Sequence, residues 1–335
     1  MSGTELMNGG RGAAGARRRI RADLGLAAVL VVVLTAAALR PALEDLLDRP
    51  AVAHWATIFV SITIAAMPFL VLGVTISAAI AAFVPAGLLP RVLPDRPAAA
   101  VPVAAVAGAA LPGCECGSVP IARRLISRGA PAAAALTFLL SAPAINPIVM
   151  VSTAVAFPDQ PEVVAARFLA SLLAAIAVGL VWARFGKEAL LGRARRTHGD
   201  EGRPLSVLVS TAQHDLLHAG GFLVVGAATA ATLQTVVPRS VLDTLSGSPA
   251  LSVLALAGLA VLMAICSEAD AFVAASMTQF SMTSRLAFMV VGPMVDVKLI
   301  ALQAGTFGRR FAIRFAPLTF VAAVVSAALV GWVLL

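Results

Sequence analysis

Long uncharged stretches separated by short polar or basic segments dominate the pattern along the chain. A helix needs about 20 apolar residues to cross the hydrocarbon core of a bilayer. Nine apolar runs approach or exceed this length, and charges occur in only two of them, Arg167 in the fifth and Asp296 with Lys298 in the eighth. The runs are Leu24–Leu39, Trp55–Val84, Pro97–Pro112, Gly129–Pro158, Val163–Ala183, Leu216–Pro238, Thr244–Ser267, Leu286–Gly308 and Phe315–Leu335. The pattern therefore predicts an all-α polytopic membrane protein.

The basic residues predict how these runs are oriented. If every run crosses the membrane, Lys and Arg divide evenly between the two sides. If the third run turns back at Gly113–Pro120 (the first tip) and the seventh at Cys266–Asp270 (the second tip), most of them fall on one side. The positive-inside rule therefore favours seven full spans and two re-entrant hairpins, with the N-terminus in the cytoplasm.

The first apolar run has two interpretations. Arg17–Arg19 precede it and Ala36–Ala38 end it, as in a cleavable signal peptide. Because further apolar runs follow directly, we expect an uncleaved extra N-terminal helix.

The two halves of the chain repeat each other. Phe69–Gly73 reads almost like Phe222–Gly226, Cys114 aligns with Cys266, and Asn146 aligns with Asp296, in the same order and at nearly one offset. Under the hairpin topology the halves enter the membrane from opposite sides. The sequence therefore predicts two inverted-topology repeats, each with a re-entrant or broken-helix hairpin, as in many secondary transporters.

These elements predict one transmembrane permease domain over residues 1–335. Within it we expect a basic N-terminus with the first helix (1–50), repeat 1 (51–183), a cytoplasmic linker (184–213) and repeat 2 (214–335).

Composition narrows the function. Of 335 residues, 60% are hydrophobic and 13% are charged, so no soluble catalytic domain of ordinary size fits in the connecting segments and we expect no enzyme. The net charge of +8 comes from Arg residues beside apolar runs, which favours orientation signals and lipid contact over nucleic acid. Three Cys form no disulfide framework. We expect a lipid bilayer and a small-molecule or ion substrate as partners, and no cofactor.

The two tips combine sulfur and carboxylate side chains. Pro112 and Pro120 flank the first tip, where we expect no continuous helix and hence free backbone groups. Thiolates suit soft, thiophilic species such as trivalent arsenic, zinc or copper(I), whereas an isolated Cys is usually an inert buried hydrophobe. Candidate substrate contacts at the tips are Cys114, Glu115, Cys116, Cys266, Glu268 and Asp270.

Acidic residues inside apolar runs are costly, at roughly 2.5–3.5 kcal/mol for a charge at the bilayer centre. They therefore suggest proton coupling. The alternative is charge pairing, for example of Asp296 with Lys298. These two are separated by two positions, so they would not face each other on a regular helix.

Prolines mark expected hinges. Each frees a backbone carbonyl four residues earlier, which protein, water or substrate must satisfy. Asn146 and Asp296 lie beside these prolines in corresponding positions of the two halves, which predicts a paired polar substrate site. The expected hinges are Pro120, Pro143, Pro147 and Pro293.

Two further groups flank the predicted spans. His214 and His218 share a helix face and could chelate a metal, although a solvated helix start is the simpler interpretation. Arg123, Arg124 and Arg128 follow the first tip, where contact with lipid headgroups is favoured over attraction of an anionic substrate.

The segments GCECGSVPIARRLISRGAP, FLLSAPAINPIVM, CSEADAFVAASM and GPMVDVKL resemble those of the bacterial predicted-permease family that includes the organoarsenical efflux permease ArsP. The resemblance runs from Ala51 to the C-terminus and implies a multi-pass permease of the bacterial inner membrane. Here Glu115 stands where a small residue is expected, which shifts preference toward a cationic ligand. The family motif falls on Cys114, Cys116, Gly117, Pro120, Arg123, Pro143, Asn146, Pro147, Cys266, Glu268, Asp270, Pro293, Asp296 and Lys298.

Taken together, these features predict a secondary active permease that exports a soft, thiol-reactive solute such as a trivalent organoarsenical. One alternative is a metal-ion permease that uses Cys and acidic residues. A membrane thiol oxidoreductase is a weaker alternative, because the Cys-x-Cys spacing differs from that of redox motifs. A non-transporting scaffold is also disfavoured, because it has no use for intramembrane acids.

Overall fold

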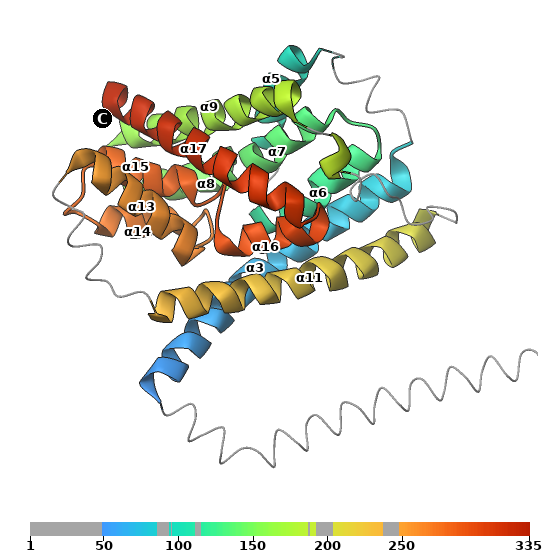
Figure 1. Ribbon diagram of the computed structural model, residues 1–335, viewed down its shortest axis with the longest axis horizontal. Helices are drawn as coiled ribbons and strands as arrows, with labels where there is room; N and C mark the ends of the chain where they lie inside the picture. Colours follow the sequence, from blue (N-terminus) through green and yellow to red (C-terminus); the bar gives the residue numbers. More distant parts are fainter. Residues whose placement is uncertain are drawn as a thin grey trace, which may run out of the picture. The chain divides into compact units, whose positions relative to one another are not determined.

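The computed structural model describes residues 49–85, 94, 96–110, 115–186, 188–191, 204–236 and 248–335. The described part of the chain is helical and contains no strand, which confirms the predicted all-α class (Figure 1). The chain divides into two units, Met1–His54 and Trp55–Leu335, and the second unit holds nearly all the described helices. The predicted first helix and Cys114 lie outside the described residues.

The helices follow one order twice. Each half has a long helix, a short apolar helix, a helix that starts at or just after a tip, a broken helix in two pieces, and a second long helix. In the first half these are α3 (Pro50–Phe83), α5 (Pro97–Gly108), α6 (Glu115–Ser127), α7 (Ala132–Ile145), α8 (Pro147–Ala156) and α9 (Pro161–Phe185). In the second half they are α11 (Pro204–Val236), α13 (Pro249–Met263), α14 (Asp270–Ser276), α15 (Met282–Val291), α16 (Val297–Thr306) and α17 (Arg309–Leu334). This shared order agrees with an internal repeat. Between the halves lies a short 3₁₀-helix, Glu188–Leu191, and α11 begins at Pro204, inside the expected linker.

Helix length separates spanning from non-spanning elements. Among the described residues, five helical stretches are long and apolar enough to cross a bilayer: α3, α7 with α8, α9, α11 and α17. The 12 residues of α5 and the 15 of α13 reach only about 18 and 22 Å, short of the roughly 30 Å hydrocarbon core. These lengths fit helices that enter the membrane and turn back, as predicted for the third and seventh runs.

The first long helices of the two halves pack antiparallel. Trp55, near the start of α3, donates its Nε1–H to the Thr232 hydroxyl near the end of α11, at 3.0 Å. Ser77, late in α3, lies 3.4 Å from the Asp215 carboxylate, early in α11. Figure 1 shows α3 and α11 side by side. Helices that correspond in the repeat therefore run in opposite directions.

The last long helices of the two halves, α9 and α17, also pack antiparallel. Trp182, near the end of α9, packs edge-on against Phe315, near the start of α17, with ring centroids 5.7 Å apart. Ser326, late in α17, donates to the Ala170 carbonyl, early in α9, at 2.6 Å. Antiparallel packing of both corresponding pairs is what an inverted repeat requires, although the orientation of the halves in the membrane stays a prediction.

Small residues bring the helices into close contact. A Cβ atom on Gly73 of α3 would overlap the backbone of Gly117 in α6, so these helices touch through their main chains. In the second half, a Cβ atom on Gly226 of α11 would lie 2.6 Å from Cα of Lys298 in α16. Without a hydrophobic driving force between helices in lipid, such close packing supplies much of their attraction.

The Gly226 contact predicts a position-specific loss of stability. Gly226→Val should push α11 away from α16 and lower the free energy of unfolding by about 1–3 kcal/mol through overpacking. The control is Gly221→Val on the same helix, because nothing lies within 4 Å of the added Cβ there. Thermal unfolding midpoints in detergent compare the two. Equal midpoints would contradict the close packing.

Candidate functional site

The first tip is more helical than its prolines suggest. The expectation that no helix crosses Gly113–Pro120 is wrong from Glu115 onward, because α6 starts there and continues through Pro120. A proline inside a membrane helix is tolerated where neighbouring groups compensate. Pro120 has no N–H to donate to the Cys116 carbonyl one turn earlier, so one regular intrahelical hydrogen bond of α6 is missing at the tip.

A buried ion pair joins the first tip to the second half. Glu115 Oε1 lies 2.5 Å from Nζ of Lys298, and both side chains are fully buried. The Lys298 ammonium also donates to the Ala264 carbonyl, at 2.9 Å, where α13 ends just before the second tip. Lys298 therefore connects α6, α16 and the end of α13.

Asp296 completes the coordination of this ammonium. Its Oδ2 lies 3.5 Å from Nζ of Lys298. The expectation that the two would not face each other is wrong because it assumed a continuous helix. Asp296 instead has extended backbone (φ −142°) before α16 starts, which lets its carboxylate reach toward Lys298.

The two described thiols lie near the same ammonium. Glu115 of the first tip binds Lys298, and Lys298 also donates to the Ala264 carbonyl, two residues before Cys266, so the first and second tips converge around this ammonium. Cys116 is fully buried and Cys266 is half-buried, and neither forms a disulfide within the described residues.

The second tip is held by a different cation. Arg167, fully buried in α9, places Nη2 2.7 Å from Asp270 Oδ2 and 3.1 Å from the Ser267 carbonyl. Its Nη1 donates to the Thr153 hydroxyl of α8 at 2.8 Å. We did not predict Arg167 as a site residue. The available signal was an Arg inside an apolar run, which rarely occurs without a partner.

Glu268 is the tip acid without such a partner. Its side chain is half-buried, and neither carboxylate oxygen has a hydrogen-bond partner in good geometry among the described residues. Its charged neighbours are Glu115, Lys298 and Arg167, which lie within electrostatic range.

Asn146 and Asp296 have the same structural role. Each follows a helix and caps the next: Asn146 Oδ1 accepts from the Val149 N–H at 3.0 Å, and Asp296 Oδ1 from the Leu299 N–H at 2.6 Å. Their correspondence in the repeat therefore reflects matching helix breaks, each with a capped half-helix start. Whether they also contact a substrate stays a prediction.

The four expected hinge prolines occupy different settings. Pro143 lies inside α7, which continues to Ile145, so the break falls after this proline. Pro147 occupies the first position of α8, where no intrahelical N–H is needed. Pro293 lies in the turn between α15 and α16, and Pro120 inside α6.

A second charged cluster lies at the far end of α6. Asp215 of α11 is buried, with its carboxylate 3.3 Å from both Arg123 and Arg124 and 3.4 Å from the Ser77 hydroxyl. Asp215 therefore offsets one of the two positive charges of Arg123 and Arg124 inside the protein, and contact of these arginines with lipid headgroups stays a prediction. Arg128 donates to the Ala81 carbonyl of α3.

The histidines do not form a metal centre with their described neighbours. His214 and His218 stack, with ring centroids 6.1 Å apart, and His218 Nε2 lies 3.3 Å from the Gly305 carbonyl. In the described ranges, no three His, Cys, Asp or Glu residues are grouped to hold a metal ion.

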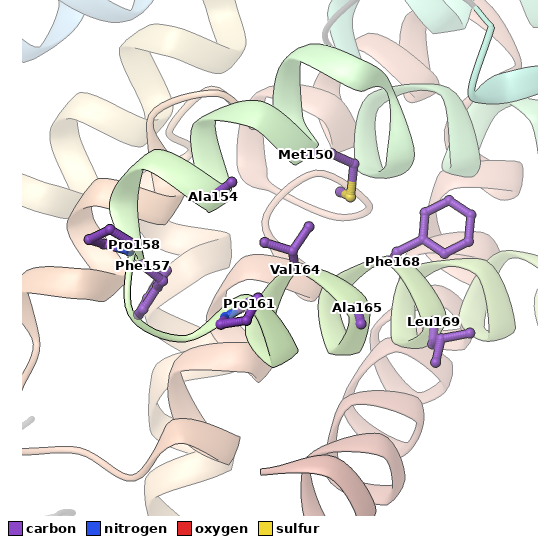
Figure 2. A pocket seen from close by; sticks show the side chains of 9 residues that line it. All are labelled: Met150, Ala154, Phe157, Pro158, Pro161, Val164, Ala165, Phe168 and Leu169. Carbon is purple, nitrogen blue, oxygen red and sulfur yellow. The ribbon is translucent and has the colours of Figure 1, made fainter.

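Apolar hollows lie apart from the tips. Figure 2 shows one of about 780 Å³ between α8 and α9, and a second of about 370 Å³ lies between α8 and α14. Neither is lined by a tip residue. The first is lined by Met150, Ala154, Phe157, Pro158, Pro161, Val164, Ala165, Phe168 and Leu169. Such a surface suits lipid chains, whereas the polar chemistry is packed between the two halves.

A multi-pass helical protein that buries charged side chains and thiols between two similar halves belongs to the class of membrane permeases. The family model ArsP_1, described as "Predicted permease", matches residues 51–332, and the chain belongs to this family.

Two curated relatives extend this finding. The chain is 37% identical over 278 residues to "UPF0718 protein YcgR" of Bacillus subtilis (strain 168), which covers 81% of this chain and 94% of that protein. It is 29% identical over 282 residues to "Putative two-component membrane permease complex subunit" of Streptococcus mutans, covering 82% and 94%. No solved structure matches the chain at a significant level.

The Arg167–Asp270 pair predicts non-additive stability changes. Arg167→Met or Asp270→Leu alone should lower the free energy of unfolding by about 3–5 kcal/mol, because each change leaves the other charged group buried without its ion-pair partner. The double variant Arg167→Met with Asp270→Leu should lose much less than the sum of the two single losses. Thermal unfolding measures all three, with Arg184→Met, exposed on the same helix, as control. Additive losses would show that the two residues act independently.

Proposed function

We propose that this permease is a secondary active exporter of a soft, thiol-reactive solute, with trivalent organoarsenicals as the best candidates. The Lys298 ammonium carries the proposal, because it binds Glu115 next to Cys116 and the Ala264 carbonyl two residues before Cys266, and so brings the two Cys-containing tips together. Thiols from both tips would offer a trivalent arsenical two sulfur ligands. A ligand bound from both halves can couple their relative movement.

Helix breaks and carboxylate side chains also favour the meeting point of the two tips as the substrate-binding site. Pro120 interrupts the regular hydrogen bonding of α6 near Cys116, and the capped starts of α8 and α16 follow Asn146 and Asp296. Broken helices that start near a site supply polar groups without exposing them to lipid. Glu115, Glu268 and Asp270 provide carboxylates beside the thiols.

The antiparallel packing of corresponding helices supports alternating access by an inverted repeat. In that mechanism the halves exchange roles, so that the site faces each side of the membrane in turn. The breaks at Asn146 and Asp296, with Pro143, Pro147 and Pro293 beside them, are the proposed hinges. By the positive-inside rule we place the N-terminus in the cytoplasm of a bacterial inner membrane.

Cysteine replacement tests the thiol contacts. Cys116→Ser and Cys266→Ser, alone and together, should abolish protection of an arsenic-sensitive host against methylarsenite, because a hydroxyl of similar size binds trivalent arsenic poorly. Cys114→Ser belongs in the same set. Membrane abundance of each variant and the thermal midpoint of the purified protein control for folding.

A second arsenical tests whether the variants act through thiol binding or through a general change in the resistance of the cells to arsenic. Pentavalent methylarsenate has no comparable thiol affinity, so its toxicity should not change with any of these variants. Full protection against methylarsenite by the double Cys116→Ser, Cys266→Ser variant would contradict the proposal and leave the permease assignment intact.

A further inference from the structure

The charged groups around the tips do not balance. Four acids are in electrostatic contact there: Glu115, Glu268, Asp270 and Asp296. Two bases, Arg167 and Lys298, face them from α9 and α16. If every group is ionised, the cluster therefore has two negative charges in excess, in a part of the protein where water is scarce. Because buried net charge is costly, a cation has to bind to the cluster and offset this negative charge.

The ion pairs show which acids have a base of their own. Asp270 is 2.7 Å from the Arg167 guanidinium, so this pair is neutral. The Nζ of Lys298 lies 2.5 Å from a Glu115 oxygen and 3.5 Å from an Asp296 oxygen. A single ammonium can offset the negative charge of only one of these two carboxylates. Glu268 has no cation within ion-pair distance among the described residues, so it is the tip acid with least compensation.

Unsatisfied oxygen atoms lie at the same place. Glu115 is fully buried, and its Oε2 has no hydrogen-bond partner among the described residues, although Oε1 pairs with Lys298. The buried oxygens of Glu268 meet no donor from another described residue, and its carboxylate accepts a hydrogen bond only from its own backbone N–H. Glu268 follows Ala264 and Ser267, whose carbonyls bind Lys298 and Arg167, so its tip lies beside the Glu115–Lys298 pair. Two carboxylates contain only acceptors, so a hydrogen bond within the pair requires an added proton.

The geometry favours a proton over a metal ion. A divalent metal needs several oxygen, nitrogen or sulfur ligands gathered at bonding distance. In the described ranges no three His, Cys, Asp or Glu residues are so gathered, although the acids act on one another electrostatically. A proton requires only one oxygen and one neighbouring acceptor.

We propose that Glu268, in the tip that meets the Glu115–Lys298 pair, binds the proton that drives this permease, an inference that rests on the secondary transport proposed above. The remaining charged or titratable groups around Glu268 and Glu115 are Lys298 and Asp296 at the start of α16, Arg167 of α9, Asp270 of α14, and the thiols of Cys116 and Cys266. A proton that enters on Glu268 removes one excess charge as the site closes. Its release to the opposite side restores that charge and resets the exporter.

Infrared difference spectroscopy tests the proton site without any transported solute. The full-length protein in lipid bilayers should show a protonated-carboxyl band at a pH where exposed carboxylates are ionised. Glu268→Gln should remove the band and Glu268→Asp should retain it. The control is Glu162→Gln, an exposed acid in the first turn of α9, which should leave the band unchanged. A band of wild-type size in folded Glu268→Gln would overturn the proposal.

Transport in proteoliposomes tests the coupling. An imposed pH gradient should drive methylarsenite accumulation by the wild type, and the ratio of gradient-driven uptake to solute exchange should fall at least about tenfold in Glu268→Gln. An unchanged ratio would overturn the coupling role. If the wild type moves no methylarsenite, the proposed substrate fails while the infrared result still decides the proton site.

Discussion

The buried ammonium of Lys298 is the constraint on which the rest of the structure depends. A positive charge inside a membrane protein is tolerated only where protein groups replace its water. Glu115 supplies a carboxylate from the first half, Asp296 a second from the residue before α16, and Ala264 a carbonyl from the end of α13. The three partners of Lys298 lie at the start of α6, just before the start of α16 and at the end of α13, so this ammonium ties these helix ends together. The two tips are brought together by the same requirement.

Each half has a buried carboxylate at a tip, and the two carboxylates are paired with different bases. The short helices α6 and α14 each begin with an acid, Glu115 and Asp270, and each acid meets a fully buried base. The bases come from unrelated places, Lys298 in α16 and Arg167 in α9. The two acids do not correspond in the predicted repeat either, because the alignment of Cys114 with Cys266 sets Glu115 against Ser267. The two orientations of the halves can therefore differ in stability even though their helices correspond.

Much of the fold could be predicted from sequence because lipid imposes strong rules. Length, apolar runs and breaks around Asn146 and Asp296 locate helices without knowledge of their packing. The alignment of Cys114 with Cys266 shows that the tips correspond, whereas their meeting is seen only in the contacts of Lys298 with Glu115 and Ala264. Side-chain partners could not be predicted from the sequence. Asp296 reaches Lys298 because its backbone is extended, and Arg123 and Arg124 pair with Asp215, which lies about ninety positions away.

The helix α6 is anchored by charge at both ends. Glu115 at its start is bound to Lys298, and Arg123 and Arg124 in its last turns are bound to Asp215 of α11, while Gly117 leaves no space against α3. A sliding motion along its own axis would separate both sets of ion pairs together and drag the close contact with α3. Rotation about its middle, near the Pro120 position, disturbs each end less. The contacts at the two ends of α6 therefore oppose its translation along its own axis more strongly than its rotation about the middle.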